Sequence, residues 1–365
     1  MNDDFSAAMR RASELVRGGD AAGATSLIQS LLGGASPTSP DLQASAPQAP
    51  QGLGKALAEL KARMPRVTTP GFTMPGLATP EPALPEGARF DGGTFACAAG
   101  SRDYRVYLPR LDGAAPTGLV MMLHGCTQNP VDFANGTDMN RLAEEHGLII
   151  IYPAQARGAN MQSCWNWFSQ RDQQRGAGEP EILAGLASRI REDHEVPHDR
   201  IFVAGLSAGA AMAVILGRVY PDVFAAVGAH SGLPYGSASD MPSALATMAG
   251  NAPALPRKAE STVPIIIFHG SADTTVHPSN GQRIADDIRP SGTEIQDSGM
   301  QGGRRFTRRM VLSESGSSTS EHWSIEGLGH AWSGGNPAGS YVDASGPDAS
   351  AEMLRFFLDL PRKGN

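Results

Sequence analysis

The sequence has neither an excess of basic residues nor a long apolar run. Its 365 residues include 30 Lys and Arg against 37 Asp and Glu, which gives a formal net charge of −7. Because nucleic-acid-binding domains usually carry a basic excess, we expect no nucleic-acid partner. The longest apolar run, residues 210–216, is far shorter than the roughly 20 residues that cross a bilayer, so we expect no transmembrane segment.

Cysteine is also scarce, and the motifs of nucleotide-binding proteins are missing. Three cysteines in a chain of this length do not form a disulfide scaffold. Cys126 and Cys164 have no metal-ligand spacing with the histidines. Neither a glycine-rich dinucleotide fingerprint nor a phosphate-binding loop with its lysine is present. We therefore expect no metal and no cofactor.

The composition divides the chain into three regions. Residues 1–33 carry two loose apolar stripes separated by a Gly-Gly pair, which predicts an N-terminal helical pair. Residues 34–87 are rich in Pro, Ala and Ser and hold ten of the 27 prolines, which is typical of an extended linker. We expect the main folded domain, and any chemistry that the chain performs, at 88–365. The first residues are acidic and lack the apolar core of a secretory signal, which favours a cytoplasmic location and leaves secretion open.

After residue 88, apolar runs alternate with helical patterns. The apolar runs predict strands at 104–108, 118–123, 148–152, 201–204, 224–229 and 263–268. The helical patterns lie mainly at 138–146, 182–195, 208–219 and 350–360. Continuous apolar strands that alternate with helices indicate an α/β fold, in which a mostly parallel sheet has helices on both faces.

Three polar, glycine-containing turns follow strands of this predicted sheet. They are His-Gly-Cys-Thr-Gln at 124–128, Gly-Leu-Ser-Ala-Gly at 205–209 and His-Gly-Ser-Ala-Asp at 269–273. In open parallel sheets, ligands bind beyond the carboxyl ends of the strands. We therefore expect the three turns to form one site.

The turn at 205–209 fits the Gly-x-Ser-x-Gly pattern of a nucleophile elbow. It lies between a predicted strand and a predicted helix, so the turn must be tight, and small residues at 205 and 209 avoid a Cβ clash. Ser207 is the candidate nucleophile. The alternative is that Ser207 only caps the following helix.

A serine hydroxyl needs a general base at neutral pH, and four of the nine histidines follow the serine at a useful distance. His330 lies in a glycine-rich loop shortly before the last predicted helix, from which an imidazole can reach over the serine. It is our candidate base, and His277 is the alternative. His269 and His322 belong to strand-like runs, which favours structural roles.

The candidate acid is Asp273, since the chain order in this architecture is serine, acid, histidine. It follows the predicted strand at 263–268, where its carboxylate can orient the imidazole. The alternative is an aspartate that binds only the N–H groups of its own turn. Two backbone N–H groups are needed for an oxyanion hole, and we expect them from Ala208 and Cys126.

Taken together, these motifs resemble the polyhydroxybutyrate (PHB) depolymerase family of esterases, whose relatives include feruloyl and acetylxylan esterases. The resemblance covers roughly residues 88–361. It rests on the three turns together with Cys-Trp-Asn-Trp-Phe at 164–168 and Gly-His-Ala-Trp-Ser-Gly-Gly at 329–335. It implies an α/β-hydrolase fold with a catalytic triad of Ser207, Asp273 and His330.

The resemblance implies hydrolysis of PHB or of 3-hydroxybutyrate oligomers inside the cell, with residues 1–33 as a candidate attachment to the storage-granule surface. The alternative is a feruloyl or acetylxylan-type carboxylesterase that acts on small or aromatic esters. A third hypothesis is a non-catalytic granule-associated protein, which a complete triad disfavours.

The surroundings of the site are less defined by the sequence. Residues 231–262, where such folds often insert a lid, are short and contain one weak helical patch, so we expect an open site without a large lid. Trp165, Trp167 and Trp332 either line the substrate site or pack in the core. Cys126 and Cys164 either form a disulfide that joins the oxyanion loop to the aromatic loop or remain two reduced, buried thiols.

Overall fold

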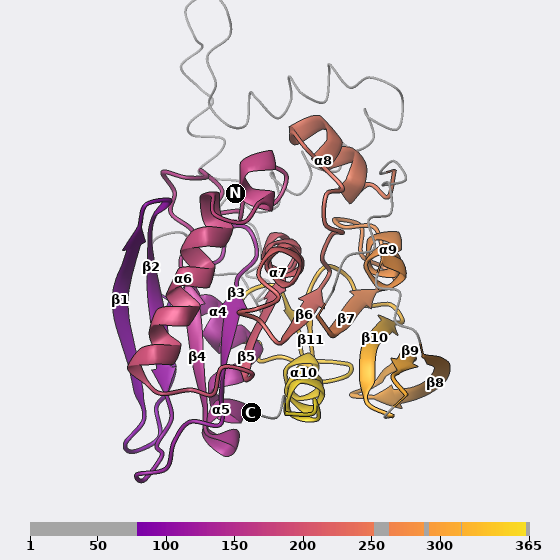
Figure 1. Cartoon of the computed structure of the whole chain (residues 1–365). Coiled ribbons are helices and arrows are strands. Elements are labelled where there is room, and N and C mark those ends of the chain that lie inside the picture. Colours follow the sequence, from indigo (N-terminus) through magenta and orange to yellow (C-terminus); the bar gives the residue numbers. More distant parts are fainter. Residues whose placement is uncertain (1–78, 252–262, 288–291, 315, 363–365) are drawn as a thin grey trace, which may run out of the picture.

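A ten-stranded sheet runs through the computed structural model, which describes residues 79–251, 263–287, 292–314 and 316–362. The strand order is β1-β2-β4-β3-β5-β6-β7-β10-β9-β8 (Figure 1). The six central strands, from β4 to β10 in this order, are parallel to one another. Antiparallel strands flank them on both sides. The predicted mostly parallel sheet is therefore confirmed.

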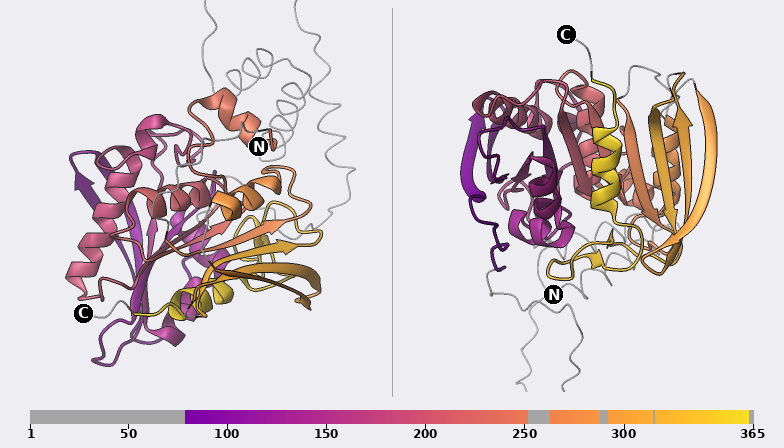
Figure 2. Two further views of the ribbon diagram at one scale, coloured as in Figure 1. Left: turned by 45° about the vertical axis from the view of Figure 1, so that its right-hand side comes forward. Right: turned by 90° about the horizontal axis from the view of Figure 1, so that it is seen from below.

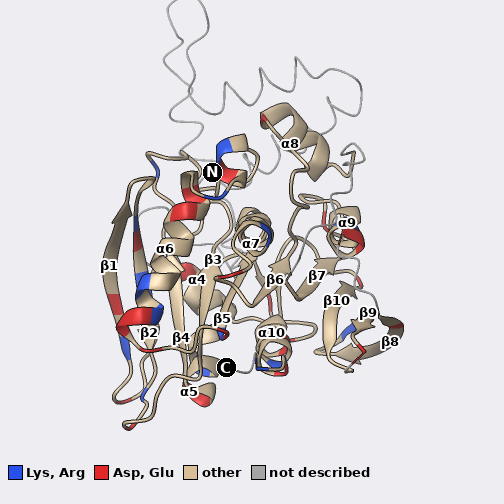
Figure 3. Ribbon diagram, viewed as in Figure 1, with Lys and Arg blue, Asp and Glu red and all other residues tan. Residues whose placement is uncertain are grey.

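The strands are β1 (Arg89–Cys97), β2 (Gly100–Leu108), β3 (Gly118–Leu123), β4 (Leu148–Pro153), β5 (Ile201–Leu206), β6 (Ala226–His230), β7 (Ile265–Gly270), β8 (Thr293–Gln301), β9 (Arg304–Leu312) and β10 (Ser318–Ile325). A separate two-stranded sheet pairs β11 (Trp332–Ser333) with β12 (Val342–Asp343). Every residue of β3 to β7 is buried, and these strands carry no Asp, Glu, Lys or Arg (Figure 3). Burial on both faces explains why they appear in the sequence as continuous apolar runs.

Helices cover both faces of the sheet, as Figure 2 shows. They are α4 (Pro130–Thr137), α5 (Met139–His146), α6 (Gly178–Asp193), α7 (Ala208–Val219), α8 (Met241–Met248), α9 (Ser279–Asp287), α10 (Ala349–Leu358) and the short 3-10 helix η1 (Gln170–Gln173). Apolar side chains of α6 and α7 pack on one face of the sheet, and those of α4, α5 and α10 pack on the other. Alternate residues of each central strand belong to these two cores.

The sheet is wider than the six strands that the sequence predicts. Strands β1, β8 and β9 are amphipathic or largely exposed, so they lack the continuous apolar signal that marks the central strands. The predicted helical pair at 1–33 and most of the predicted linker at 34–87 lie outside the described residues. In the part of the chain that the structure describes, no helix is long and apolar enough to span a membrane.

Candidate active site

Ser207 lies in a strained turn between β5 and α7. Its backbone adopts φ 57° and ψ −119°, a left-handed conformation that non-glycine residues rarely adopt. A Cβ on Gly209 would lie 2.0 Å from the carbonyl oxygen of Leu123, and one on Gly205 would lie 2.5 Å from the backbone of Gly209. Only glycine allows this close approach of strand and helix. Ser207 occupies the N-cap position of α7, but its side chain makes no capping hydrogen bond, which argues against a capping role.

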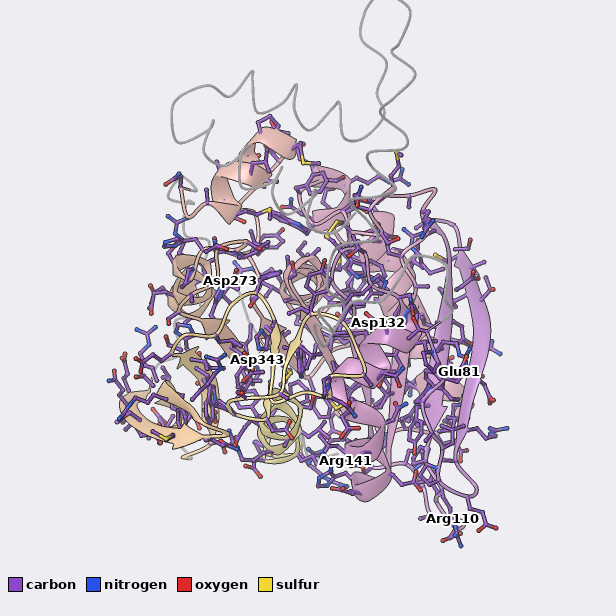
Figure 4. The ribbon with its side chains drawn as sticks, turned by 180° about the vertical axis from the view of Figure 1, so that it is seen from behind. Glu81, Arg110, Asp132, Arg141, Asp273 and Asp343 are labelled. Carbon is purple, nitrogen blue, oxygen red and sulfur yellow. A yellow bond between two sulfur atoms is a disulfide. The ribbon has the colours of Figure 1, made fainter. Side chains whose placement is uncertain are left out.

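His330 and Asp273 are in direct contact. The Nδ1 atom of His330 donates to Oδ2 of Asp273 over 2.7 Å. Asp273, labelled in Figure 4, lies in the turn after β7, where its other oxygen accepts hydrogen bonds from the N–H groups of Thr275 and Val276. Burial opposes ionisation of Asp273, but His330 and His269 outweigh it and hold the pKa of the carboxyl well below its usual range. The carboxylate is therefore charged at neutral pH.

The contact with Asp273 fixes the tautomer of His330. A proton on Nδ1 leaves Nε2 of the neutral ring as an acceptor. Ser207 and His330 both line one cavity, although no hydrogen bond joins the Ser207 hydroxyl to the imidazole among the described residues. Catalytic hydrogen bonds are often long in the absence of substrate. The alternative base, His277, instead bonds Ser279 through its Nδ1 atom (2.9 Å).

The predicted oxyanion donors lie at the same cavity. Cys126 and Ala208 both line it, and neither backbone N–H has a protein acceptor within the described ranges. The loop around Cys126 is held on both sides, because Gly125 N–H donates to the side chain of Gln128 and Thr127 N–H donates to the carbonyl of Gln162. An oxyanion hole requires two backbone N–H groups that have no protein acceptor and that are held in a fixed position.

A disulfide joins Cys126 to Cys164. The sequence left this pairing open between a disulfide and two reduced thiols. The bond links the loop at 124–128 to the aromatic loop at 164–168, so these two loops are covalently connected at the cavity that Ser207 also lines.

The buried ring of His124 holds the loop at 124–128 in place, a contact that no sequence pattern indicates. Its ring donates from Nδ1 to the Gly125 carbonyl (2.8 Å) and accepts from Gln155 N–H at Nε2 (3.1 Å). The ring is fully buried, and burial lowers its pKa to about 4, so it is neutral at physiological pH. The Trp165 indole donates to the carbonyl of His124 (3.1 Å), which ties the two loops together a second time.

The buried side chain of Glu179 accepts hydrogen bonds from residues that hold the two loops in place. It accepts hydrogen bonds from the side chain of Gln155 and from both the backbone and the side chain of Asn166. Arg102 forms an ion pair with it at 3.0 Å. Gln155 also donates to the carbonyl of Cys164, so Glu179 connects α6 to both loops. Burial raises the pKa of Glu179, partly offset by these donors.

The cavity has a volume of about 470 Å³, within the usual range of small-molecule sites. Of the three candidate tryptophans, only Trp167 lines it. Trp165 and Trp332 are almost fully buried, so of the two alternatives that the sequence leaves open, both follow core packing. Trp332 donates its indole N–H to Ser350 (3.1 Å) and stacks on His230. The indole N–H groups of Trp165 and Trp332 therefore both have a hydrogen-bond acceptor inside the fold.

The region in which the sequence predicts no large lid contributes one wall of the cavity. Helix α8 lies beside the cavity and lines it with four of its residues. No large inserted lid is present between 231 and 251, and residues 252–262 lie outside the described part.

The parallel sheet and the strained serine turn define an α/β-hydrolase fold. The structure is similar to the solved acetyl xylan esterase from Aspergillus awamori, with a TM-score of 0.55 and 20% identity over 71% of this chain and 94% of that one. The family model described as Esterase PHB depolymerase matches residues 102–306. The chain therefore belongs to the PHB depolymerase family of esterases, as the sequence motifs predict.

Individual relatives fall into two groups. Poly(3-hydroxyalkanoate) depolymerase C of Paucimonas lemoignei is 31% identical over 58% of this chain and 54% of its own length. The poly(3-hydroxybutyrate) depolymerase of Ralstonia pickettii is 29% identical over 66% of this chain and 54% of its own length. Acetylxylan esterase A of Aspergillus oryzae is 28% identical over 48% of this chain and 62% of its own length. The chain thus spans little more than half the length of the relatives it matches.

Proposed function

We propose that the protein is a serine esterase in which Ser207, His330 and Asp273 form the catalytic triad. The observation that carries the proposal is the 2.7 Å contact of Asp273 with His330 at the cavity that also exposes Ser207. This arrangement supplies a strained nucleophile, a base of fixed tautomer and a charged residue that orients it.

Hydrolysis would proceed in two steps. Nε2 of His330 takes the hydroxyl proton while Oγ of Ser207 forms a bond to the ester carbonyl carbon. The negative charge moves to the carbonyl oxygen, where the N–H groups of Cys126 and Ala208 stabilise it. The ester C–O bond then breaks, and the imidazolium gives its proton to the leaving alcohol. Water repeats the sequence on the acyl-enzyme and releases the acid.

For the substrate, we propose 3-hydroxybutyrate polyester or its oligomers. Two supports are the depolymerases among the relatives and the apolar character of much of the cavity wall, which suits an aliphatic ester. The alternative is an acetylxylan or feruloyl-type esterase, which the acetylxylan relatives and the aromatic pair of Trp167 and Phe168 at the cavity support.

The test is release of 3-hydroxybutyrate from amorphous PHB granules and from 3-hydroxybutyrate trimer, measured beside acetate release from acetylated xylan. Ser207→Ala is the control. Release of 3-hydroxybutyrate that disappears in the variant supports the proposal. Release of acetate alone moves the assignment to the alternative. No Ser207-dependent hydrolysis of any ester contradicts an esterase and leaves a non-catalytic granule-associated protein.

We further propose that the enzyme works in the cytoplasm and that residues 1–33 attach it to the granule surface. The disulfide is an observation against the location, since disulfides persist mainly in oxidising compartments. Co-sedimentation with PHB granules, compared between the full chain and a chain without residues 1–33, tests the attachment. Equal binding of both would contradict it. Trapping of free thiols in intact cells tests the compartment.

A further inference from the structure

One face of helix α8 forms an apolar wall of the cavity. The residues at positions i, i+3, i+4 and i+7 of this helix line the cavity, and they are Met241, Ala244, Leu245 and Met248. This spacing places all four on a single side of an α-helix. None of the four side chains carries a hydrogen-bonding nitrogen or oxygen. Ala244 and Leu245 are buried, and the two methionines are partly exposed.

This wall is fixed relative to the loop that carries Asp273. The side chain of Asn280, which is fully buried, donates to the carbonyl of Thr247 over 2.8 Å. His277 N–H donates to the carbonyl of Met248 at 2.8 Å. At its other end, α8 begins with a capping box between Asp240 and Ser243. The C-terminal end of the helix is thus bonded to the segment that follows Asp273, which fixes its apolar face relative to that residue.

The loops at 126–128 and 160–164 give the cavity a second, polar side. Thr127, Asn160, Gln162 and Tyr341 line it with hydroxyl and amide groups. The hydroxyls of Thr127 and Tyr341 lie 3.2 Å apart, and the side-chain oxygen of Asn160 accepts from Gln162 N–H. The side chain of Gln162 has no hydrogen-bond partner within the described residues. The cavity therefore offers hydrogen-bonding side chains along these loops and none along the face of α8.

We propose that the cavity face of α8 contacts the alkyl part of the acyl group and sets the acyl length that the enzyme accepts. This rests on the proposed esterase function. Alkyl groups gain free energy when they leave water for such a wall. A sugar hydroxyl placed there would lose its hydrogen bonds to water without replacement. The substrate class is an ester of an aliphatic acid, such as a 3-hydroxyalkanoate, whose carbonyl groups face the polar side.

The test compares kcat/KM for nitrophenyl esters of acetate, butyrate, hexanoate and octanoate. Ala244→Phe fills the cavity from the α8 face, and Ala246→Phe places the same side chain on the same helix away from the cavity. We expect Ala244→Phe to lower the ratio of octanoate to acetate kcat/KM by at least about tenfold, with hexanoate affected in the same direction. Ala246→Phe is expected to keep the wild-type profile.

A second variant keeps the test decisive if Ala244→Phe fails to fold. Met248→Ala enlarges the cavity, so its ratio of octanoate to acetate turnover is expected to rise. An unchanged chain-length profile in both cavity variants, with folding verified by thermal unfolding, would overturn the role of α8 while the esterase function stands. The proposed function itself would fail instead if wild type and Ser207→Ala hydrolysed none of the four esters.

Discussion

The ring of His230 accepts a hydrogen bond from the backbone N–H of Ser333, with 3.1 Å between Nε2 and the nitrogen. Ser333 lies three residues after His330, so this bond anchors the loop of the proposed base. The carbonyl of His230 in turn accepts from Ser207 N–H at 2.9 Å. Burial lowers the pKa of His230 to about 3, which keeps the ring neutral and able to accept at Nε2. One buried histidine therefore connects the nucleophile turn to the base loop.

We predict that His230→Phe lowers kcat by about 10- to 100-fold, because small displacements of a catalytic group have effects of this size. Phenylalanine keeps the ring that stacks on Trp332 and Phe268 but removes the acceptor for Ser333. KM is expected to stay within twofold, since the cavity walls are unchanged. Steady-state kinetics on nitrophenyl butyrate measure both constants.

The matched control is His322→Phe, which also replaces a buried histidine, but one in β10 whose Nε2 atom has no hydrogen-bond partner within the described residues. It is expected to change the free energy of unfolding with little effect on kcat. Equal kcat values for wild type and His230→Phe would show that the bond to Ser333 has no part in positioning His330.

Replacement of the orienting carboxylate has a larger expected effect. Asp273→Asn retains an oxygen that can accept from Thr275 and Val276, but it removes the charge that faces His330. In a Ser–His–Asp triad such a change favours the wrong tautomer and lowers kcat by about 10⁴. We expect a loss of this order, with the fold intact by circular dichroism. A loss below about tenfold would mean that Asp273 serves only its own turn.

The local parts of the site could be predicted from the sequence. The glycines at 205 and 209 are required by contacts within a few residues of the turn and with the adjacent strand, so the motif itself encodes the geometry of Ser207. The central strands were also predictable, because burial on both faces leaves a continuous apolar run. The glycine-rich loop and the chain order predict His330 as the base, and the structure places its ring against Asp273.

Long-range contacts explain what the sequence did not reveal. Glu179 is an unremarkable glutamate in a helical pattern, and its role depends on Arg102, which is 77 residues away. His230 gains its role from Ser333, 103 residues further on. Trp332 sits in a motif beside the proposed base, yet its ring points into the core, which no local pattern indicates. Such partners are defined only once the sheet brings the loops together.

Three buried histidines predict that stability falls in mild acid. Burial is the largest cause that lowers the pKa values of His124, His230 and His322, to about 4, 3 and 4. In the unfolded chain they titrate near 6.5, so below that pH the unfolded state binds more protons and gains stability. Each histidine should therefore cost at most about 1.4 kcal/mol of unfolding free energy per pH unit between about pH 6 and 5.

Urea unfolding at pH 7, 6 and 5 measures this dependence. Asp273 does not confuse this measurement. Its pKa is lowered in the folded state, so the stability that it contributes is lost only below the pKa of an unfolded aspartate, about 4, which lies under the range of pH 5 to 7. The variant His230→Phe removes one titrating group, so its stability should decline less steeply than that of wild type. If the free energy of unfolding were the same at pH 7 and pH 5, these histidines would not be buried in the neutral form.

The disulfide between Cys126 and Cys164 should support both stability and catalysis. It closes a loop with a sequence separation of 38, and bonds of this kind typically contribute about 2–4 kcal/mol. In the double variant Cys126→Ser and Cys164→Ser, only hydrogen bonds such as that from Thr127 N–H would hold the backbone around residue 126. We therefore expect a lower kcat together with a lower free energy of unfolding. The matched control is Cys97→Ser, which removes the remaining cysteine outside the site. A double variant with wild-type kcat would show that the oxyanion loop keeps its geometry without the covalent link.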